Sequence, residues 1–195
     1  MVWDPIHRLE ACPSSDGACA MVLTDEKGGD AASRKPAWIH GISVKSELGQ
    51  FPGRDPVNPV GGQECAADVY AQAGITNPLE EIDVAEIYVP FSWYEPMWME
   101  NLGFMPKGDG WKITESGGTE MDGQLPVNPS GGVLSSNPIG ASGLIRCLEA
   151  ANQVRGTAGD YQVDGAKVAM GHAYGGAAQY FAMWIVSSEL QPEFT

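Results

Sequence analysis

The chain has 195 residues, about the length of one domain, and 43% of them are hydrophobic, which allows a sizeable core and excludes wholesale disorder. Its 25 acidic residues outnumber 11 basic ones, so the formal net charge is −14 at pH 7. Because a nucleic-acid-binding protein must neutralise phosphates with Lys and Arg, we expect no nucleic-acid partner.

The start of the sequence and its scattered cysteines bear on where the protein works. MVWDPIHRLE lacks the basic end and the apolar stretch of a secretory signal, and no run of about 18 apolar residues is available to span a membrane. The cysteines and histidines are too dispersed for a disulfide framework or a zinc site. They are Cys12, Cys19, Cys65, Cys147, His7, His40 and His172. We therefore expect a cytoplasmic protein without a metal site.

Strand and helix patterns alternate in the first half of the chain. Residues 38–45 (WIHGISVK) alternate roughly as a half-buried strand does. Apolar residues in 62–73 recur at helical spacing, and Gly74 is suited to end that helix. Residues 84–91 (VAEIYVPF) are mostly apolar, which predicts a buried strand.

A second helix and a long irregular stretch are expected next. Ser92 and Glu95 fit the capping box S-x-x-E, which predicts a helix from this point to about Gly103. The stretch 105–136 is rich in Gly, Pro and Ser, so we expect mostly irregular structure. Two short strands are expected within it, at 112–114 and 125–127.

The last part of the chain predicts one more helix and two strands. The helix covers 142–155 and ends at Gly156. Its inward side chains are expected to be Leu144, Leu148, Ala151 and Val154. The strands are 166–171 and 179–186. Strands that alternate with helices in this way predict an α/β layered fold with a central sheet.

The segment 128–143 (NPSGGVLSSNPIGASG) places many small residues directly before a helix. Small residues let a backbone or a ligand approach closely, and the free amides at a helix start can bind an anion or a developing oxyanion. The segment fits neither G-x-x-x-x-G-K-S/T nor G-x-G-x-x-G after a strand. It is therefore either a structural glycine loop or a ligand-binding loop.

Two residues near strand ends are candidates for proton transfer. His172 lies in GHAYGG (171–176), where an imidazole among glycines and beside a phenol could exchange protons near neutral pH. It could equally be a hydrogen-bonded histidine at a strand end. Tyr88, at the end of the strand 84–91, is either an acid/base group or a core residue.

Large apolar side chains are unusually dense between residues 91 and 105. They are Phe91, Trp93, Tyr94, Met97, Trp98, Met99, Phe104 and Met105. A buried helix rich in Met and aromatic residues would explain most of them. Because large apolar residues lie on both sides of this helix, one face is alternatively the lining of a hydrophobic pocket.

Four stretches carry a specific combination of motifs: DVAEIYVPFS (83–92), ENLGFMPKG (100–108), LPVNPSGGVLSSNPIGASGLIRCLEAANQVRG (125–156) and QVDGAKVAMGH (162–172). Together they resemble the C-terminal half of thiolases, closest to the sterol-carrier/lipid-transfer branch. CPSSDGACAMVL (12–23) resembles the last strand of that family's N-terminal domain. The resemblance implies a mixed sheet with helices on both faces. It also implies that residues 1–30 end an N-terminal domain and that residues 31–195 form the C-terminal domain.

Several positions that correspond to thiolase motifs hold different residues in this sequence. The family's nucleophilic cysteine lies in its first half, and no cysteine of this chain matches it. SNP (136–138) stands in place of Gly-His-Pro, and YVPF (88–91) in place of His-Asp-Cys-Phe. The C-terminal histidine is retained in HAYG (172–175), but the Asn that follows it is not. We expect an oligomeric half-thiolase, completed by an N-terminal thiolase half or a second thiolase-like chain.

These exchanges favour retro-aldol cleavage of an acyl-CoA ester over thiolysis. Thiolysis needs a nucleophile, a second acid/base group and an oxyanion site, whereas a retro-aldol step needs a base for the β-hydroxyl and donors for the thioester enolate. The resemblance implies Tyr88 and His172 as acid/base groups and Asn137 as the oxyanion donor. Thiolase-like aldolases of this family act on steroid-CoA esters with a partner that carries a zinc-ribbon and an OB-fold, so such a partner is expected here.

The resemblance also implies which residues contact the substrate. They are Gly140, Gly143, Tyr174, Gly175, Trp93 and Tyr94. The bulky side chains of Trp93, Tyr94 and Met97 suit a large apolar acyl group, and coenzyme A is expected as part of the substrate, without a covalent cofactor. Two alternatives stay open: an ordinary thiolase whose cysteine lies on another chain or half, and a non-catalytic subunit that binds lipid-CoA or stabilises a partner.

Overall fold

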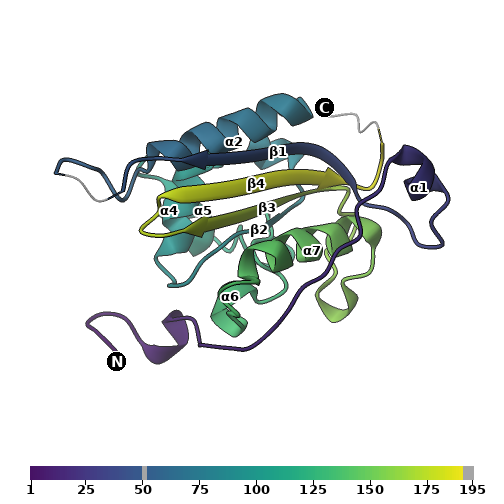
Figure 1. The fold of residues 1–195 in the computed structure, drawn as a ribbon. Helices are drawn as coiled ribbons and strands as arrows, with labels where there is room; N and C mark the ends of the chain where they lie inside the picture. Colours follow the sequence, from purple (N-terminus) through teal and green to yellow (C-terminus); the bar gives the residue numbers. More distant parts are fainter. Residues whose placement is uncertain (50–51, 191–195) are drawn as a thin grey trace.

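The computed structural model describes residues 1–49 and 52–190, and its centre is a mixed four-stranded sheet. The strands are β1 (Trp38–Ser46), β2 (Val84–Glu86), β3 (Val168–Gly175) and β4 (Tyr180–Ser187). Their order is β1-β4-β3-β2. β4 pairs antiparallel with β1 and β3, and β2 pairs parallel with β3 (Figure 1). The predicted α/β fold with a mixed sheet is confirmed.

Helices cover both faces of this sheet. α2 (Val60–Ala73) lies along one face, with α4 (Tyr94–Asn101) and α5 (Gly110–Glu115) in the same layer, and α7 (Ser142–Arg155) lies along the other face (Figure 1). The remaining helical segments are η1 (Arg8–Glu10), α1 (Glu26–Asp30), α3 (Pro78–Glu81), α6 (Gly132–Ser135) and η2 (Gly159–Tyr161). No helix formed by the described residues is long and apolar enough to cross a membrane.

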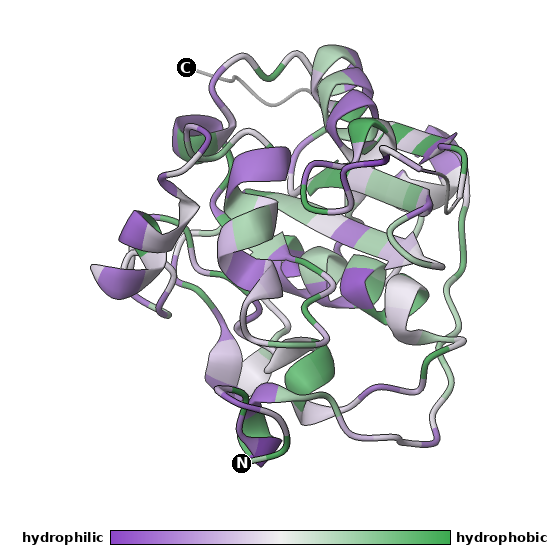
Figure 2. Ribbon diagram, turned by 90° about the vertical axis from the view of Figure 1, so that its left-hand side faces the viewer, coloured by the Kyte–Doolittle hydropathy of each residue, from purple (hydrophilic) through white to green (hydrophobic). Residues whose placement is uncertain are grey.

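Alternating side chains of β4 build two cores. Phe181, Met183 and Ile185 are buried with α2 and α4 on one side of the sheet. Trp184 and Val186 point to the other side and pack with apolar residues of α7. Successive side chains of a strand point to opposite faces, so one apolar strand contributes to both layers. Figure 2 shows the resulting hydrophobic segments in the strands at the centre of the molecule.

Glycines end the two longest helices as the sequence predicts. Gly74 follows α2 with φ 80°, and Gly156 follows α7 with φ 71°. Both are in the left-handed region that a side chain with a Cβ adopts only at a cost. Their amides donate to carbonyls of the last helical turn.

The predicted capping box at the start of α4 is wrong. Ser92 donates its hydroxyl to Glu10 Oε1 (2.9 Å), and Glu95 Oε1 accepts from Thr114 and Thr119 (2.9 Å each). The helix begins at Tyr94, and no side chain caps it. Partners distant in sequence bind both side chains, so the local pattern does not decide where this helix starts.

Other local expectations also differ from the structure. The strand expected at 112–114 lies within the helix α5, and β2 ends at Glu86 rather than at residue 91. Of the strand expected at 125–127, only an isolated bridge between Val127 and Ala85 forms. Leu144, expected to point inward from α7, is 43% exposed because the buried stripe of the helix is shifted toward Arg146 and Cys147.

Residues 12–23, expected as the last strand of an N-terminal domain, form neither helix nor strand. The amide of Cys12 donates to the carbonyl of Pro90 (2.9 Å), but no ladder continues from there. A strand forms only against a neighbouring strand, and the described residues supply none at this position. The division between 1–30 and 31–195 stays a prediction, and its last residues, 191–195, lie outside the described part of the chain.

Candidate active site

Three segments meet near one end of α7. Tyr88 follows β2, Asn137 lies in the loop that leads into α7, and His172 and Tyr174 lie on β3. The structure therefore brings together the three residues predicted to do chemistry. Segments far apart in the sequence supply them, because β2 and β3 are neighbours in the sheet and α7 packs across both.

Asn137 is the centre of a buried polar cluster. Its Oδ1 accepts hydrogen bonds from the hydroxyls of Tyr88 (3.1 Å) and Ser142 (2.7 Å). Its Nδ2 donates to Sγ of Cys12 (3.3 Å), and its backbone amide donates to Oγ of Ser15 (3.3 Å). Two hydroxyl donors on one oxygen orient the amide plane, so the NH₂ group is turned toward Cys12.

Tyr88 is buried between this cluster and the sheet. Burial raises the pKa of its phenol, and the hydrogen bond to Asn137 partly offsets that effect. The phenol is therefore protonated at neutral pH and donates to Asn137. The arrangement can pass a proton between the phenol and a bound group, with an amide donor alongside.

His172 differs from the expected histidine at a strand end. It lies inside β3 with no exposed surface, and its ring packs against Trp98 at a centroid distance of 4.8 Å. Its Nδ1 accepts the backbone N–H of Tyr88 (3.4 Å), and its Nε2 has no hydrogen-bond partner among the described residues. Burial lowers its pKa to about 3. The ring is neutral at physiological pH, which does not fit the expected proton exchange near neutrality.

Aromatic rings extend the site away from Asn137. The ring of Tyr174 meets Tyr88 edge-on at 5.2 Å and is nearly parallel to Tyr94 at 5.4 Å. Trp93 stacks on Tyr94 at 3.9 Å and remains 46% exposed. Burial raises the pKa of Tyr174. The predicted substrate contacts Trp93, Tyr94 and Tyr174 thus form one continuous aromatic wall beside Tyr88.

The three predicted glycine contacts have different surroundings. A Cβ added to Gly143 would lie 3.0 Å from Cβ of Ala173, so this glycine lets α7 approach β3 closely. A Cβ at Gly140 would meet nothing within 4 Å. A Cβ at Gly175 would meet only Tyr180 at 3.9–4.0 Å. Packing therefore explains the glycine at 143 and leaves the other two positions open to a ligand.

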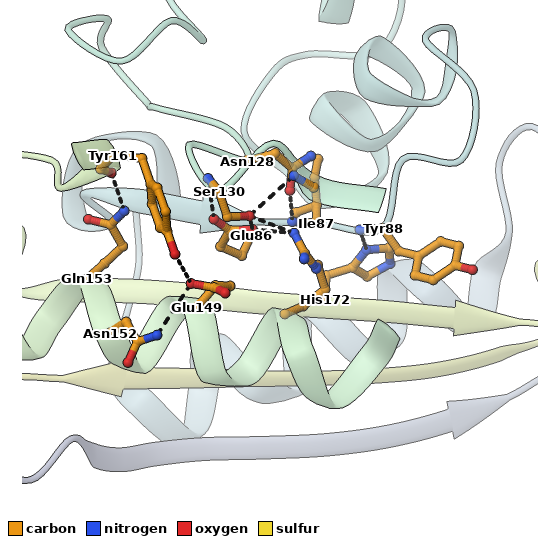
Figure 3. Close-up of polar contacts among 12 residues, drawn as sticks. Glu86, Ile87, Tyr88, Asn128, Ser130, Glu149, Asn152, Gln153, Tyr161 and His172 are labelled. Atoms are coloured by element: carbon orange, nitrogen blue, oxygen red, sulfur yellow. Dashed lines mark hydrogen bonds and ion pairs between the residues drawn. The ribbon is translucent and has the colours of Figure 1, made fainter. Parts of the chain in front are cut away.

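A buried ion pair that was not predicted from the sequence lies at the end of β2, two residues before Tyr88. Glu86 Oε2 accepts from Nη1 of Arg146 (2.5 Å) and from Oγ of Ser130 (2.8 Å), and Oε1 accepts the Ser130 amide (3.1 Å). Burial raises the pKa of Glu86, and Arg146 acts in the opposite direction. Figure 3 shows Glu86 and Ser130 side by side, with Tyr88 and His172 nearby.

A signal for this pair was present in the sequence. Glu86 is the one charged residue within an otherwise apolar strand, and a carboxylate buried there needs a cation or several donors. Ser142 and Cys12 offered no comparable signal, since small residues are common before a helix and a single cysteine matches no motif. Their contacts with Asn137 depend on the fold.

The described residues hold no group of three His, Cys, Asp or Glu side chains that could bind a metal ion. Residues 46–188 match the family model described as "Thiolase C-terminal domain-like". The chain belongs to this thiolase family. Family membership fits the mixed sheet with helices on both faces.

Curated relatives extend the same conclusion. Sterol carrier protein 2 of Bos taurus is 36% identical over 181 residues, which are 89% of this chain and 33% of the relative. Acetyl-CoA acetyltransferase of Methanothermobacter thermautotrophicus is 34% identical over 189 residues, which are 96% of this chain and 49% of the relative. The chain thus spans between a third and a half of the length of these thiolase relatives.

A solved structure shares the fold. The structure described as "Ltp2-ChsH2(DUF35) aldolase" superposes with a TM-score of 0.74 at 22% identity, over 96% of this chain and 48% of that one. At this identity the match supports the architecture and not the reaction.

Proposed function

We propose that this chain is one half of a thiolase-superfamily enzyme that cleaves a carbon–carbon bond of a β-hydroxyacyl-CoA by a retro-aldol reaction. The hydrogen bond from the Tyr88 phenol to Asn137 Oδ1 (3.1 Å) carries this proposal. It joins a proton-transfer group to an amide donor in a site where the family's Gly-His-Pro histidine has become Asn137. An amide can stabilise an enolate but cannot exchange protons.

In the proposed reaction, the oxygen of Tyr88 takes up the proton of the β-hydroxyl while the phenol releases its own proton, so that Tyr88 stays neutral and relays one proton. The Cα–Cβ bond breaks, Cβ becomes a carbonyl, and the electron pair forms a thioester enolate on Cα. The N–H of Asn137 Nδ2 that Cys12 does not engage stabilises the enolate oxygen, together with loop amides. The proton that the phenol releases adds to Cα and completes the shorter acyl-CoA. We assign His172 to hold the Tyr88 backbone amide, because its pKa of about 3 makes it a poor base.

The aromatic wall supports a large apolar acyl group as the substrate class. Trp93 keeps nearly half of its surface exposed while it stacks on Tyr94, and Tyr94 in turn stacks on Tyr174. Tyr94 and Tyr174 are partly buried. Covering the exposed indole face beside them with an apolar group is favourable, because apolar surface is removed from water. Coenzyme A is proposed as the carrier part of this substrate.

A second chain or half is proposed to complete the site. α7 covers the β2 and β3 part of its sheet face, whereas Ile39, Ile42 and Val44 of β1 stay exposed on that face. A register shift between Ile39 and Gly41 keeps all three on one side. Contiguous exposed apolar residues mark contact surfaces. An N-terminal thiolase half or a second thiolase-like chain is the proposed occupant, and a zinc-ribbon/OB-fold subunit is a further proposed partner.

The test is turnover of a β-hydroxyacyl-CoA by the enzyme assembled with its co-purifying partners. Tyr88→Phe keeps the ring that packs on Tyr174 and removes only the hydroxyl, so it should lower kcat about 100-fold or more. Tyr180→Phe, on an exposed tyrosine of β4, is the matched control and should retain wild-type kcat. Equal rates in Tyr88→Phe and the wild type would remove Tyr88 from the mechanism. A variant that loses Tyr88, Asn137 and His172 together yet stays active would favour the non-catalytic alternative.

A further inference from the structure

We propose that Glu86 and Arg146 are positioning residues that hold Asn137 against Tyr88 by clamping the loop that contains Ser130. This inference rests on the proposed function, since it explains how the proposed site keeps its shape. Within residues 1–49 and 52–190, no hydrogen bond or ion pair joins Glu86 or Arg146 to Asn137 or Tyr88. It acts through the backbone segments that carry them.

The Glu86–Arg146 ion pair is buried, and together with Ser130 it forms a clamp that connects three elements. Glu86 on β2 is 0% exposed and Arg146 on α7 is 3% exposed. Between them lies Ser130, whose Oγ donates to Glu86 Oε2 (2.8 Å) and accepts from Arg146 Nη1 (3.0 Å) and from the Gly132 amide (3.2 Å). One serine hydroxyl thus ties the loop to a strand and to a helix at once.

Each clamped element carries a member of the proposed site. Tyr88 follows Glu86 by two residues on the same strand exit, and Ser142 lies one turn before Arg146 on α7. Asn137 lies on the chain that continues from Ser130 through α6. A small shift of any of these elements would therefore change the hydrogen bonds that Asn137 makes with Tyr88 and Ser142.

A second set of contacts holds the loop beside the end of strand β2. Oδ1 of Asn128 accepts the Ile87 amide (2.8 Å), and the Asn128 amide donates to the carbonyl of Ala85 (2.9 Å), contacts that Figure 3 shows in part. Asn128 has φ 51°, a left-handed conformation that asparagine tolerates better than most residues. Together with the contacts of Ser130 to Glu86, these bonds fix the loop beside residues 85–87.

Stability alone does not require a charged pair at this place. Removing one partner of a buried ion pair is strongly destabilising, whereas replacing both with apolar residues of similar volume is often neutral or stabilising. A purely structural role and a positioning role therefore make opposite predictions for the activity of an apolar double variant. This difference defines the experiment.

The experiment compares Arg146→Met with the double variant Glu86→Leu/Arg146→Met in the assembled enzyme. The single variant should lower Tm, because Glu86 is left buried without its cation, and the double variant should regain most of that Tm. The double variant should nevertheless lose about 100-fold in kcat with KM little changed, because misplacing a reacting group by about 1 Å has an effect of this size. Lys112→Met, which breaks an exposed ion pair with Asp109, is the control and should change neither value.

A double variant that regains both Tm and kcat would overturn the proposal. Should the double variant fail to regain its Tm, Ser130→Ala removes the hydroxyl that both charged groups share and is expected to show the same loss of kcat. Wild-type kcat in Ser130→Ala would overturn it as well.

A second readout is independent of the reaction. Asn137 Nδ2 donates to Cys12 Sγ, so the rate at which iodoacetamide alkylates Cys12 reports the position of Asn137. In a Cys19→Ser background, the double variant and Ser130→Ala should both alter this rate at least threefold. Hydrogen exchange of residues 128–138 should become faster in both. Unchanged alkylation and exchange would overturn the proposed positioning role, whereas a wild-type enzyme without aldol activity would overturn only the proposed function.

Discussion

At the residue scale, the orientation of one amide decides what the site can do. The Oδ1 atom of Asn137 accepts hydrogen bonds from the hydroxyls of Tyr88 and Ser142, so its Nδ2 group is left to donate. A histidine at this position would add a proton-transfer group, whereas the amide supplies only donation and acceptance. The family-level resemblance predicted Asn137 and Tyr88 as site residues. It could not predict Ser142 and Cys12, because their contacts arise from segments that meet only in the fold.

The donor role assigned to Asn137 predicts a kinetic effect. Asn137→Ala removes the proposed oxyanion donor and should lower kcat by about 100-fold with a smaller effect on KM, since the donor acts mainly on the transition state. Steady-state kinetics on a β-hydroxyacyl-CoA measure both values. Asn152→Ala on α7 is the control and should leave kcat unchanged. A tenfold rise in KM at constant kcat would show ground-state binding instead.

Burial of His172 predicts a loss of stability in acid. Its folded-state pKa of about 3 lies below the ordinary value of 6.5, so the unfolded chain takes up the proton first as the pH falls. The stabilisation of the folded protein by the neutral His172 ring is therefore complete above pH 6.5. It is lost as the pH falls from 6.5 to 3. Between pH 7 and pH 4, the free energy of unfolding of the wild type should fall by about 3 kcal/mol more than that of His172→Gln. Urea unfolding measures both values. Parallel losses in the two proteins would contradict a buried neutral imidazole.

At the element scale, the sequence predicts where helices end better than where they begin. Gly74 and Gly156 end their helices through their own backbone freedom, which sequence alone predicts. The start of α4 depends instead on Glu10, Thr114 and Thr119, which hold Ser92 and Glu95 away from a capping role. The strand expected at 112–114 is a helix for a similar reason, since short segments take the structure that their neighbours stabilise.

The left-handed end of α7 gives a stability prediction. Gly156→Ala places a Cβ at φ 71° and should lower the free energy of unfolding by about 1 kcal/mol. Gly140→Ala adds the same methyl group where nothing lies within 4 Å, so its effect should stay within about 0.5 kcal/mol. Chemical denaturation of the two variants side by side measures the difference. A larger loss in Gly140→Ala than in Gly156→Ala would contradict the backbone argument.

At the scale of the whole molecule, a chain of 195 residues first suggests one self-sufficient domain. The fold is indeed one layered unit, but its relatives are two to three times as long, and one sheet face keeps apolar residues of β1 exposed. The motif at 125–156 was specific enough to predict the family. The part of the sheet that stays uncovered depends on where α7 lies across it, and no sequence pattern predicts this position.

This exposed face predicts an effect on assembly. Val44→Lys puts a charge on a side chain that is 72% exposed on the open face of β1, so it should raise the Kd for the co-purifying partner at least tenfold while the chain stays folded. Val60→Lys makes the same exchange on α2, across the sheet, and should leave the Kd unchanged. Titration calorimetry with circular dichroism as the folding control measures both. Equal affinity for the two variants would place the partner elsewhere.

In the proposed reaction, the assembled enzyme breaks a carbon–carbon bond without forming a covalent acyl-enzyme. The most direct measurement is mass-spectrometric product analysis of the wild-type complex, with a β-hydroxyacyl-CoA and with the matching β-ketoacyl-CoA, each with and without free coenzyme A. Retro-aldol cleavage predicts a carbonyl compound and a shorter acyl-CoA from the hydroxy substrate, formed at the same rate without free coenzyme A. Cleavage of the keto substrate alone, dependent on free coenzyme A and accompanied by acylation of a cysteine, would contradict it.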